Sequence, residues 1–449
     1  MRVKKIQVTN YKGFKDCSVE FHPNVNVFIG SNASGKTSLL KAIVKPIYSG
    51  ITAAVANTPN QNKSLVIEPN DLNYKANFLS IITWLFDFPQ YSEDLSIILS
   101  TNPDSSYQQA MNEHHNKRSK FLTWLNRLAS TTTLTVPIIK FYPANRGAIG
   151  YTQERHHQQP LQISQFEAWT NIYQDNLSYS KFFKWFLENE TNELLLQRDA
   201  QDFNIQNPAL RDVRKALNKA FEFIGYDQCR IKVKQIKREG SNELIPTLVL
   251  EEIKSKKEES LDNKSDGEKA IITLIADIAY NLSLAKDFVY NDDFLDSPGI
   301  VLIDEIETHL HPNWQRQILP MLTTIFPNIQ FFVTTHSPQI ISSIRSECVF
   351  AMENFQVKRV HLKTLGEDSN SLLKYVFDAT ERPLEYVSLI EHFDQLMDNR
   401  ADYVKLEEVI NEIFVKENQD TAQNMSNLIT KLRLQLEAYK FDREHEKDN

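Results

Sequence analysis

Only three cysteines, Cys17, Cys229 and Cys348, are scattered along the 449-residue sequence. They are too few and too far apart for a disulfide framework or a paired metal site, so we expect buried or unreactive thiols. No run of about 18 apolar residues is present, and we therefore expect no membrane span. Residues 3–8 alternate polar and apolar side chains directly after the first Met, which indicates a strand and not a signal peptide. These absences predict a cytoplasmic protein.

Basic residues are outnumbered: 50 Lys and Arg stand against 58 Asp and Glu, which gives a net charge of -8. This balance argues against a uniformly basic nucleic-acid-binding surface, although it leaves room for a local basic groove. The composition is otherwise ordinary for a soluble protein, with 41% hydrophobic and 24% charged residues. The length allows two or three domains.

Short apolar runs alternate with helical patterns over residues 25–45 and again over residues 267–334. This alternation predicts a parallel sheet with helices on its faces, and hence an α/β fold. One helix is expected to stop near Pro46, because proline lacks the backbone donor that a helix interior needs. The expected core strands cover residues 25–29, 136–142, 300–303 and 330–334, and the expected helices cover residues 38–45, 267–284 and 313–325.

A helical insertion and a helical C-terminal region are predicted around this core. Aromatic- and Leu-rich periodicity over residues 164–224 indicates the insertion, and a hairpin is expected over residues 230–250. Residues 251–264 are charged and are expected to be a linker. The predicted division is a first lobe over residues 1–150, the insertion and hairpin over 151–260, a second lobe over 261–365 and helices over 366–449.

The first motif that carries chemistry fits the pattern G-x-x-x-x-G-K-[ST] and lies between an apolar strand and a helix. Its two glycines let backbone amides and the helix N-terminus face phosphate oxygens. The lysine would pair with the β- and γ-phosphates, and the threonine hydroxyl would bind magnesium. The alternative is a glycine turn that merely caps a helix. The predicted nucleotide-binding residues are Gly30, Ser31, Asn32, Ala33, Ser34, Gly35, Lys36, Thr37 and Ser38.

Two carboxylates, Asp304 and Glu305, follow a hydrophobic strand. Asp304 would hold magnesium, and Glu305 would polarise the attacking water. The alternative is a strand that simply ends at solvent.

His336 follows another buried strand, where it could contact the γ-phosphate and orient water. Otherwise it is a turn residue before Ser-Pro. His309 and His311 are close enough to raise a metal site, but they lack a cysteine or a third ligand nearby.

The remaining motif, Ser265, Asp266, Gly267 and Glu268, opens a long helix. Ser265 resembles a helix N-cap, so an ordinary capped helix is the plain interpretation. The same geometry can bind a γ-phosphate. If this motif and the Lys36 loop lie on opposite edges, a second copy of the chain must supply it, which predicts a homodimer or a higher homo-oligomer.

The four motifs, in this order and with these gaps, resemble those of ABC-type ATPases of the SMC and RecF group. The similarity covers residues 1–45, 136–147 and 260–345. The fold implied is a P-loop ATPase head that binds ATP and Mg²⁺. By this resemblance, residues 30–37 are Walker A, residues 265–268 the signature motif with Asp266 in place of the commoner Gly, Asp304 and Glu305 Walker B with its catalytic glutamate, and His336 the switch histidine.

The amino-acid sequences of residues 304–312 and 326–338 point to one family within this group. They resemble PtuA, the ATPase of Septu anti-phage systems, some of which are attached to retrons. This resemblance implies an HNH nuclease partner, PtuB, and in retron-linked systems a reverse transcriptase with its nucleic acid. DNA would then be contacted through the complex. Residues 142–146 lie where the glutamine loop would begin, but the residue that takes the glutamine's part stays open.

Several features of related proteins are missing. The sequence has no Cys-x-x-Cys hook and no long heptad region, which argues against a zinc-hook or SMC-like tether. No clear Toprim carboxylate set follows His336, which disfavours an OLD-type nuclease, and there is no HNH motif. We therefore expect a slow ATPase in an anti-phage complex whose nuclease activity belongs to a partner. The alternatives are a RecF-like DNA-repair ATPase that binds DNA itself and a nucleotide sensor with negligible hydrolysis.

Overall fold

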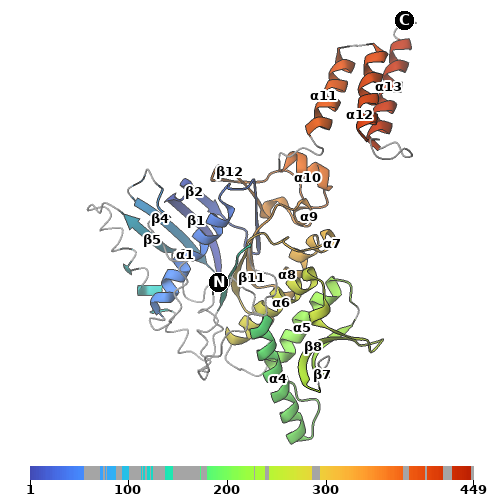
Figure 1. Ribbon diagram of the computed structural model, residues 1–449. Coiled ribbons are helices and arrows are strands. Elements are labelled where there is room, and N and C mark those ends of the chain that lie inside the picture. The colour runs from blue at the N-terminus through green and yellow to red at the C-terminus, as the bar shows by residue number, and fades with distance from the viewer. Residues whose placement is uncertain are drawn as a thin grey trace. The chain divides into compact units, whose positions relative to one another are not determined.

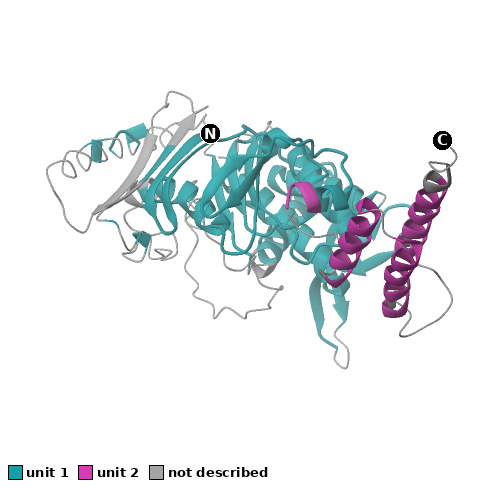
Figure 2. Cartoon of the chain, turned by 90° about the horizontal axis from the view of Figure 1, so that it is seen from above, with its two compact units in different colours: residues 1–372 teal, residues 373–449 magenta. Residues whose placement is uncertain are grey.

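The computed structural model forms two compact units, Met1–Leu372 and Leu373–Asn449 (Figures 1 and 2). The four-part division expected from the sequence is finer than this and stays a prediction. The residues that the structure describes are 1–54, 71–73, 76, 78–86, 94–100, 113, 115–116, 119–121, 123–124, 137–144, 172, 179–226, 228–237, 242–285, 294–377, 384–399, 402–417 and 427–445.

A six-stranded sheet forms the centre of the first unit, with the order β13-β12-β3-β11-β10-β6 (Figure 1). Neighbouring strands from β12 to β6 are parallel, and only β13 is antiparallel to its neighbour. The four predicted core strands are buried throughout, as strands covered on both faces must be. The α/β class is thereby confirmed. The strands are β3 (Val25–Ile29), β6 (Ile138–Tyr142), β10 (Gly299–Ile303), β11 (Ile329–Thr334), β12 (Val349–Glu353) and β13 (Gln356–Arg359).

The register of this sheet brings the predicted motifs to one edge. Ile303 of β10 lies beside Val333 of β11, and Thr334 lies beside Phe28 of β3. Because the carboxyl ends of parallel strands share an edge, the segments that follow these three strands lie side by side. Those segments contain the glycine loop, Asp304 and His336.

A second sheet is antiparallel, with the order β2-β1-β4-β5. Its strands are β1 (Arg2–Tyr11), β2 (Phe14–Glu20), β4 (Phe78–Phe86) and β5 (Asp94–Ser100). The buried Gln330 joins the two sheets, because its side chain accepts a hydrogen bond from the Val3 amide at 2.6 Å and donates one to the Val3 carbonyl at 3.0 Å.

Helix α1 (Lys36–Ala54) begins at the end of the glycine loop and continues through Pro46. The predicted stop near Pro46 is therefore wrong. Ile47 and Tyr48 are buried beyond the proline, and the buried Lys45 forms an ion pair with Asp71 at 2.5 Å. This packing outweighs the lost backbone hydrogen bond.

The predicted insertion is helical where the structure describes it. It contains α4 (Tyr179–Ala200) and α5 (Pro208–Phe223), and the side chain of Asn207 caps α5 by accepting two backbone hydrogen bonds. The predicted hairpin is β7 (Cys229–Lys237) with β8 (Leu244–Glu252).

The charged segment 251–264 is not a linker, and that prediction is wrong. It contains the end of β8, the third strand of that sheet, β9 (Glu258–Ser260), and a 3-10 turn, Leu261–Asn263. Its charges pair across the sheet, since Lys232 contacts Glu251 at 3.0 Å and Glu258 at 2.6 Å. Helix α6 (Asp266–Ala285) follows, as expected.

The predicted helix over residues 313–325 is divided into α7 (Pro312–Gln315) and α8 (Ile318–Ile325). Pro320 explains the break, because it has no amide hydrogen to donate to the carbonyl group of Arg316. Farther along the chain, α9 (Pro338–Ile341) is a single turn and α10 (Ser369–Tyr375) follows the sheet.

The second unit has a hydrophobic core of its own. Its helices are α11 (Leu384–Asp398), α12 (Tyr403–Glu417) and α13 (Asn427–His445), which confirms a helical C-terminal region. Within the described part of the chain, no helix is both long and apolar enough to cross a membrane. The core residues of this unit are Phe393, Leu406, Val409, Ile410, Ile413, Leu428, Ile429, Leu432 and Leu436.

All three cysteines are buried and free, as the sequence predicted. Burial raises the pKa of Cys17 and of Cys348 to about 11. A thiol with so high a pKa is almost wholly protonated near neutral pH and is a poor nucleophile.

Candidate nucleotide site

The glycine loop connects β3 to α1 and needs glycine at both ends. Gly30 and Gly35 have φ angles of 151° and 103°, which side chains rarely adopt. A Cβ atom at Gly30 would collide with the carbonyl oxygen of Met352, and one at Gly35 would lie 2.6 Å from the Phe355 ring. The turn between β12 and β13 therefore packs directly against the loop, a contact that the sequence did not reveal.

Lys36 is buried inside the loop. Its ammonium group donates hydrogen bonds to the carbonyl oxygens of Gly30 at 2.9 Å and Ser31 at 2.8 Å. Burial lowers the pKa of Lys36, whereas the nearby carboxylates of Asp304, Glu305 and Glu307 act in the opposite direction. A cation is thus held beside several acidic groups in a loop that can surround phosphate.

The other predicted loop residues differ in exposure. Ser31, Asn32 and Ala33 are exposed, and Ala33 adopts a φ of 63°. Ser34 is buried, and its hydroxyl oxygen has no hydrogen-bond partner among the described residues. Ser38 is half-buried in the first turn of α1.

Asp304 and Thr37 are brought together although 267 residues separate them in the sequence. The Thr37 hydroxyl donates a hydrogen bond of 2.7 Å to Asp304 Oδ2. The other carboxylate oxygen accepts one of 2.6 Å from the Thr334 hydroxyl. Hydroxyl and carboxylate oxygens are the donors that a hard cation such as Mg²⁺ prefers, so this pair fits the predicted metal.

Glu305 is half-buried at the same edge and adopts a φ of 49°. Its backbone amide donates a hydrogen bond of 2.7 Å to the hydroxyl oxygen of Thr334. Positive φ is uncommon for residues other than glycine and often accompanies functional sites. Thr334 therefore fixes both predicted carboxylate positions, a role that its place in the segment before His336 did not reveal.

His336 lies near the charged groups of Lys36, Asp304 and Glu305. It is half-buried, and its amide donates a hydrogen bond of 2.5 Å to Glu307 Oε1. Burial, aided by the charge of Lys36, lowers the pKa of His336, and the neighbouring carboxylates oppose this effect. The imidazole is thus mainly neutral near neutral pH and retains a nitrogen that can accept a proton.

The signature segment has the geometry of a capping box. The exposed Ser265 hydroxyl donates to Glu268 Oε2 at 2.7 Å and accepts from the Glu268 amide at 3.3 Å. Tyr226 donates to the second Glu268 oxygen, and Lys264 donates to the Tyr226 hydroxyl at 2.8 Å.

Gly267 is buried where the segment after Walker B passes close by. A Cβ atom at this position would lie 2.6 Å from the His309 carbonyl oxygen and 3.0 Å from the Trp314 ring. The predicted signature glycine is thus required by packing.

Helix α6, which carries the signature, and helix α1, which follows the glycine loop, have different neighbours. Helix α6 packs against α4, α5 and the edge strand β6, whereas α1 packs against β11 and the antiparallel sheet. The structure brings the glycine loop, Asp304, Glu305 and His336 together, whereas the helix that follows the signature has other packing partners.

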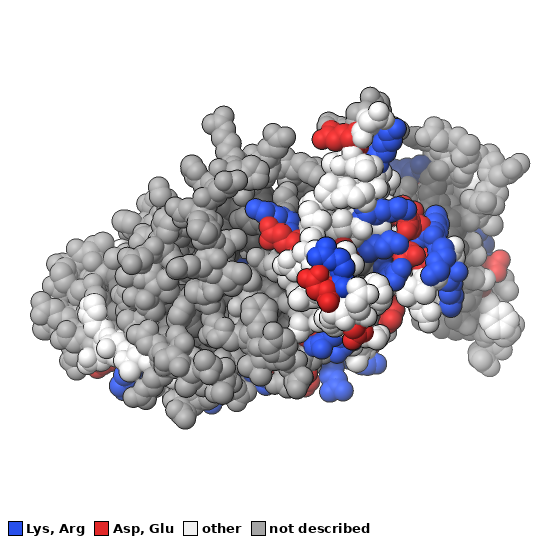
Figure 3. Space-filling view, turned by 90° about the horizontal axis from the view of Figure 1, so that it is seen from below, with Lys and Arg blue, Asp and Glu red and all other residues white. Residues whose placement is uncertain are grey.

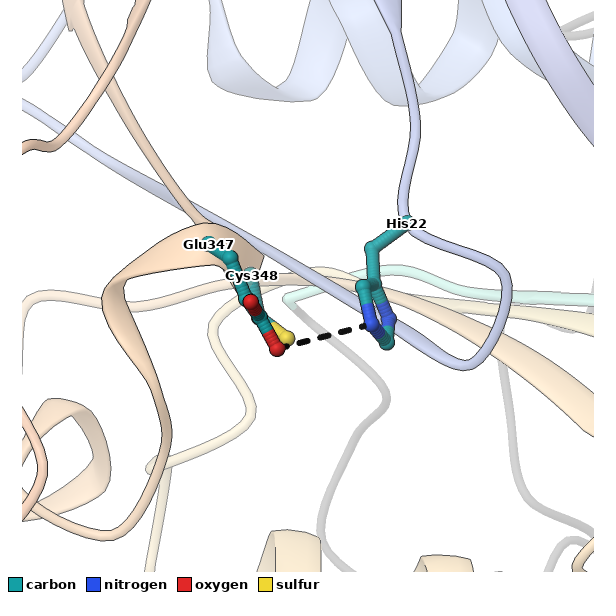
Figure 4. Close-up of side chains that lie close together, drawn as sticks. All are labelled: His22, Glu347 and Cys348. Carbon is teal, nitrogen blue, oxygen red and sulfur yellow. Dashed lines mark ion pairs between the residues drawn. The ribbon is translucent and has the colours of Figure 1, made fainter.

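Other groups of functional side chains were considered. His309 and His311 are exposed, and the His311 ring caps α7 by accepting the Asn313 amide at 3.3 Å. The described residues offer another cluster with metal-ligand chemistry, His22, Glu347 and Cys348 (Figure 4).

Hydrogen bonding disfavours a metal in this cluster. His22 Nδ1 accepts the amides of Asn24 at 3.3 Å and Val25 at 3.5 Å, so neutral His22 carries its proton on Nε2. That nitrogen faces Glu347 Oε1 at 3.9 Å. It can donate to the carboxylate, but it has no free lone pair for a metal.

A groove of about 400 Å³ lies along α5 and bears on the local basic surface that the sequence left open. Its basic lining residues are Arg211, Arg214, Lys215 and Lys219. Carboxylates engage both arginines: Asp212 contacts Arg211 at 2.6 Å, and Glu190 and Glu193 contact Arg214 at 2.8 and 2.6 Å. Figure 3 likewise shows Lys and Arg interspersed with Asp and Glu on one face. This mixture gives little support to strong, sequence-independent binding of nucleic acid.

The start of the expected glutamine loop is described only in part. The Tyr142 hydroxyl donates a hydrogen bond of 2.6 Å to Asp277, and its carbonyl accepts the Asp304 amide at 2.8 Å. Asn145 and Arg146 lie outside the described residues. The glutamine equivalent therefore stays open.

Comparisons with known proteins give a family match and several relatives. A family model described as "AAA domain, putative AbiEii toxin, Type IV TA system" matches residues 25–342. The Retron Ec83 probable ATPase of Escherichia coli is 26% identical, with 100% of this chain and 89% of that protein covered. The Septu protein PtuA of Bacillus thuringiensis is 23% identical, with 98% of each chain covered. The resemblance inferred from the motifs is thereby confirmed.

A solved SMC head bound to the C-winged helix domain of ScpA is 14% identical to this chain, with a TM-score of 0.43. The alignment covers 81% of this chain and 98% of that chain.

Proposed function

This chain belongs to the family of AAA domains described as putative AbiEii toxin, Type IV TA system, and we propose that it binds and slowly hydrolyses ATP within an anti-phage defence complex. One observation carries the proposal: the Thr37 and Thr334 hydroxyls both contact the Asp304 carboxylate, and Thr334 also holds the Glu305 backbone. This network joins the phosphate-binding loop to the two acidic residues expected to act on magnesium and water.

In the proposed complex, the loop amides and Lys36 hold the phosphates of ATP. Lys36 exchanges the carbonyl oxygens of Gly30 and Ser31 for phosphate oxygens. Thr37 and Asp304 would hold Mg²⁺, which when bound neutralises charge on the transferred phosphoryl group. The catalytic contribution is therefore mainly positioning and electrostatic stabilisation.

Glu305 is the proposed residue that orients and polarises the attacking water. Its backbone is fixed by Thr334, so its side chain projects from a defined position. His336 would contact the γ-phosphate, and a lowered pKa keeps its imidazole neutral for that role. Both assignments require side chains within hydrogen-bond reach of the reacting atoms once ATP is bound.

We propose that each site is completed by Ser265, Asp266, Gly267 and Glu268 of a second copy. Exposure of Ser265 and the packing of α6 away from α1 support this arrangement. A helix N-terminus that presents backbone amides suits a γ-phosphate. The functional assembly would then be a homodimer or a higher homo-oligomer, in which residues 1–150 and 261–365 supply the two ATPase lobes.

The names of the relatives support a biological setting for the proposed reaction. One is a retron ATPase and another a Septu protein. We propose that this chain is likewise a cytoplasmic defence subunit that controls a separate HNH nuclease, PtuB-like in type. In a retron-linked system it would also meet a reverse transcriptase and its nucleic acid, with DNA contacted through the complex. The helical insertion and residues 366–449 are the proposed surfaces for assembly.

The Glu305→Gln variant tests the proposed chemistry. The amide cannot act as a base, so we expect ATP hydrolysis to fall by about 100-fold or more, with ATP affinity within about threefold of wild type. Phosphate release and equilibrium binding of ATP measure the two quantities. Glu188→Gln, an exposed position on α4, is the matched control.

Two other outcomes would contradict the proposal. A Glu305→Gln protein that hydrolyses ATP at the wild-type rate would remove the role given to Glu305. A wild-type protein that binds ATP with magnesium but never releases phosphate would instead favour a nucleotide sensor.

A further inference from the structure

Glu307 is a third carboxylate in the candidate site, beside the two that the Walker B motif explains. It lies two residues after Glu305 and is half-buried. One of its oxygens, Oε1, accepts the backbone amide of His336 at 2.5 Å. The other, Oε2, is buried and has no hydrogen-bond partner among the described residues.

The surroundings of Glu307 place it at the reacting end of the site. Its charge acts on both Lys36 and His336. A buried carboxylate oxygen without a partner costs stability, and such groups in native proteins often mark functional positions. The contact between Glu307 and His336 joins residues 29 positions apart, on the segments after β10 and β11.

The hydrogen bond between Glu307 and His336 holds the backbone of His336 and not its side chain. His336 follows the last residue of β11 by two positions, and no regular element holds its amide. The Thr335 amide donates a hydrogen bond to the Phe28 carbonyl oxygen, whereas the His336 amide donates one to the Glu307 carboxylate. Without that acceptor, the peptide before His336 could rotate, and the imidazole direction would change with it.

We propose that Glu307 is a positioning residue that holds the backbone of His336, so that the imidazole faces the γ-phosphate. This inference rests on the proposed function, because it assigns Glu307 a role only through His336. Glu307 itself need not touch ATP. Rotation at this peptide would misplace the imidazole by an ångström or more, and such displacements cost up to about 100-fold in rate.

The test is a double-mutant cycle between Glu307→Ala and His336→Ala, with turnover and ATP affinity measured for each purified protein. We expect Glu307→Ala to lower kcat about 10- to 100-fold with ATP affinity within about threefold of wild type. Glu307→Gln should recover most of the rate, since its amide oxygen can accept the same hydrogen bond. In the His336→Ala background, Glu307→Ala should have no further effect.

Three results would overturn the proposal, and they separate it from the proposed function. If Glu307→Ala has wild-type turnover while His336→Ala is impaired, the positioning role of Glu307 is rejected and the role of His336 stands. An equal loss from Glu307→Ala in both backgrounds would show that Glu307 does not act through His336. Wild-type turnover in His336→Ala would reject the role of His336, and the present inference with it. Thermal melting confirms folding, and Glu20→Ala, an exposed position on β2, is the control.

Discussion

At the scale of single residues, Thr334 is the centre of the candidate site. Its hydroxyl donates to Asp304 and accepts from the Glu305 amide, at 2.6 and 2.7 Å. Thr334 is fully buried, so water cannot replace either contact. One hydroxyl therefore sets the position of both acidic residues relative to the loop.

Replacing Thr334 by valine keeps the shape of the side chain and removes the hydroxyl. We expect Thr334→Val to lower the free energy of unfolding by about 1–3 kcal/mol, because a buried carboxylate oxygen and a buried amide lose their partner. We also expect turnover to fall about tenfold as Asp304 and Glu305 lose their fixed positions. Urea denaturation and phosphate release measure these effects.

The matched control is Thr324→Val on α8, where the hydroxyl is exposed and donates only to the Pro320 carbonyl. It should change stability by less than about 0.5 kcal/mol. Equal stability of Thr334→Val and Thr324→Val would contradict the importance given to the Thr334 hydroxyl.

Sequence reasoning could predict Thr37, Asp304 and Glu305, because their motifs fix both residue type and spacing. Thr334 and Glu307 have no comparable signature. Their contacts arise only when β10 and β11 pair in the observed register. The role of a residue whose contacts depend on strand register cannot be predicted from the local sequence, because the pairing of the strands must be known first.

At the scale of elements, the β12–β13 hairpin supports the glycine loop from outside. The turn uses Asn354 and Phe355 with φ angles of 47° and 60°. Asparagine adopts such angles readily, but phenylalanine does not, so the turn carries only half of the usual hairpin signature. The Phe355 ring packs against Phe14 with centroids 5.2 Å apart and also covers Gly35.

Proline in α1 gives a prediction at this scale. Pro46→Ala would restore a donor for the Ala42 carbonyl and remove the clash of the proline ring. Part of the gain is offset by a more flexible unfolded chain, so we expect an increase of about 1–2 kcal/mol in the free energy of unfolding. Chemical denaturation checks this, with Pro23→Ala in an exposed turn as the control. A less stable variant would contradict this expectation and would mean that Pro46 supports the Lys45–Asp71 ion pair.

Periodicity predicted the four core strands and α6 well, but local rules failed where tertiary contacts decide. The buried Ile47 and Tyr48 carry α1 past Pro46. Pairing with β8 converts part of an apparent linker into β9. In both cases the deciding partner is remote in sequence, so no local pattern could reveal it.

At the scale of the whole molecule, the central claim is that two copies of the chain share each ATP site. The glycine loop, Asp304 and His336 meet at one edge of the sheet, whereas Ser265 is exposed at the start of α6, which packs against α4, α5 and β6. The sequence predicted the Walker residues, His336 and the signature residues. The packing of α6 against β6 and α5 is the structural observation that favours their division between two copies of the chain.

Mixing two inactive variants is the most direct measurement of this claim. Lys36→Ala removes the phosphate-binding lysine, and Ser265→Arg blocks the signature surface. Each alone should lose ATP hydrolysis, whereas an exchanged 1:1 mixture should recover about one quarter of wild-type turnover, since half of the dimers would hold one intact site. A mixture that forms mixed dimers and stays inactive would contradict shared sites, as would full activity of Ser265→Arg alone.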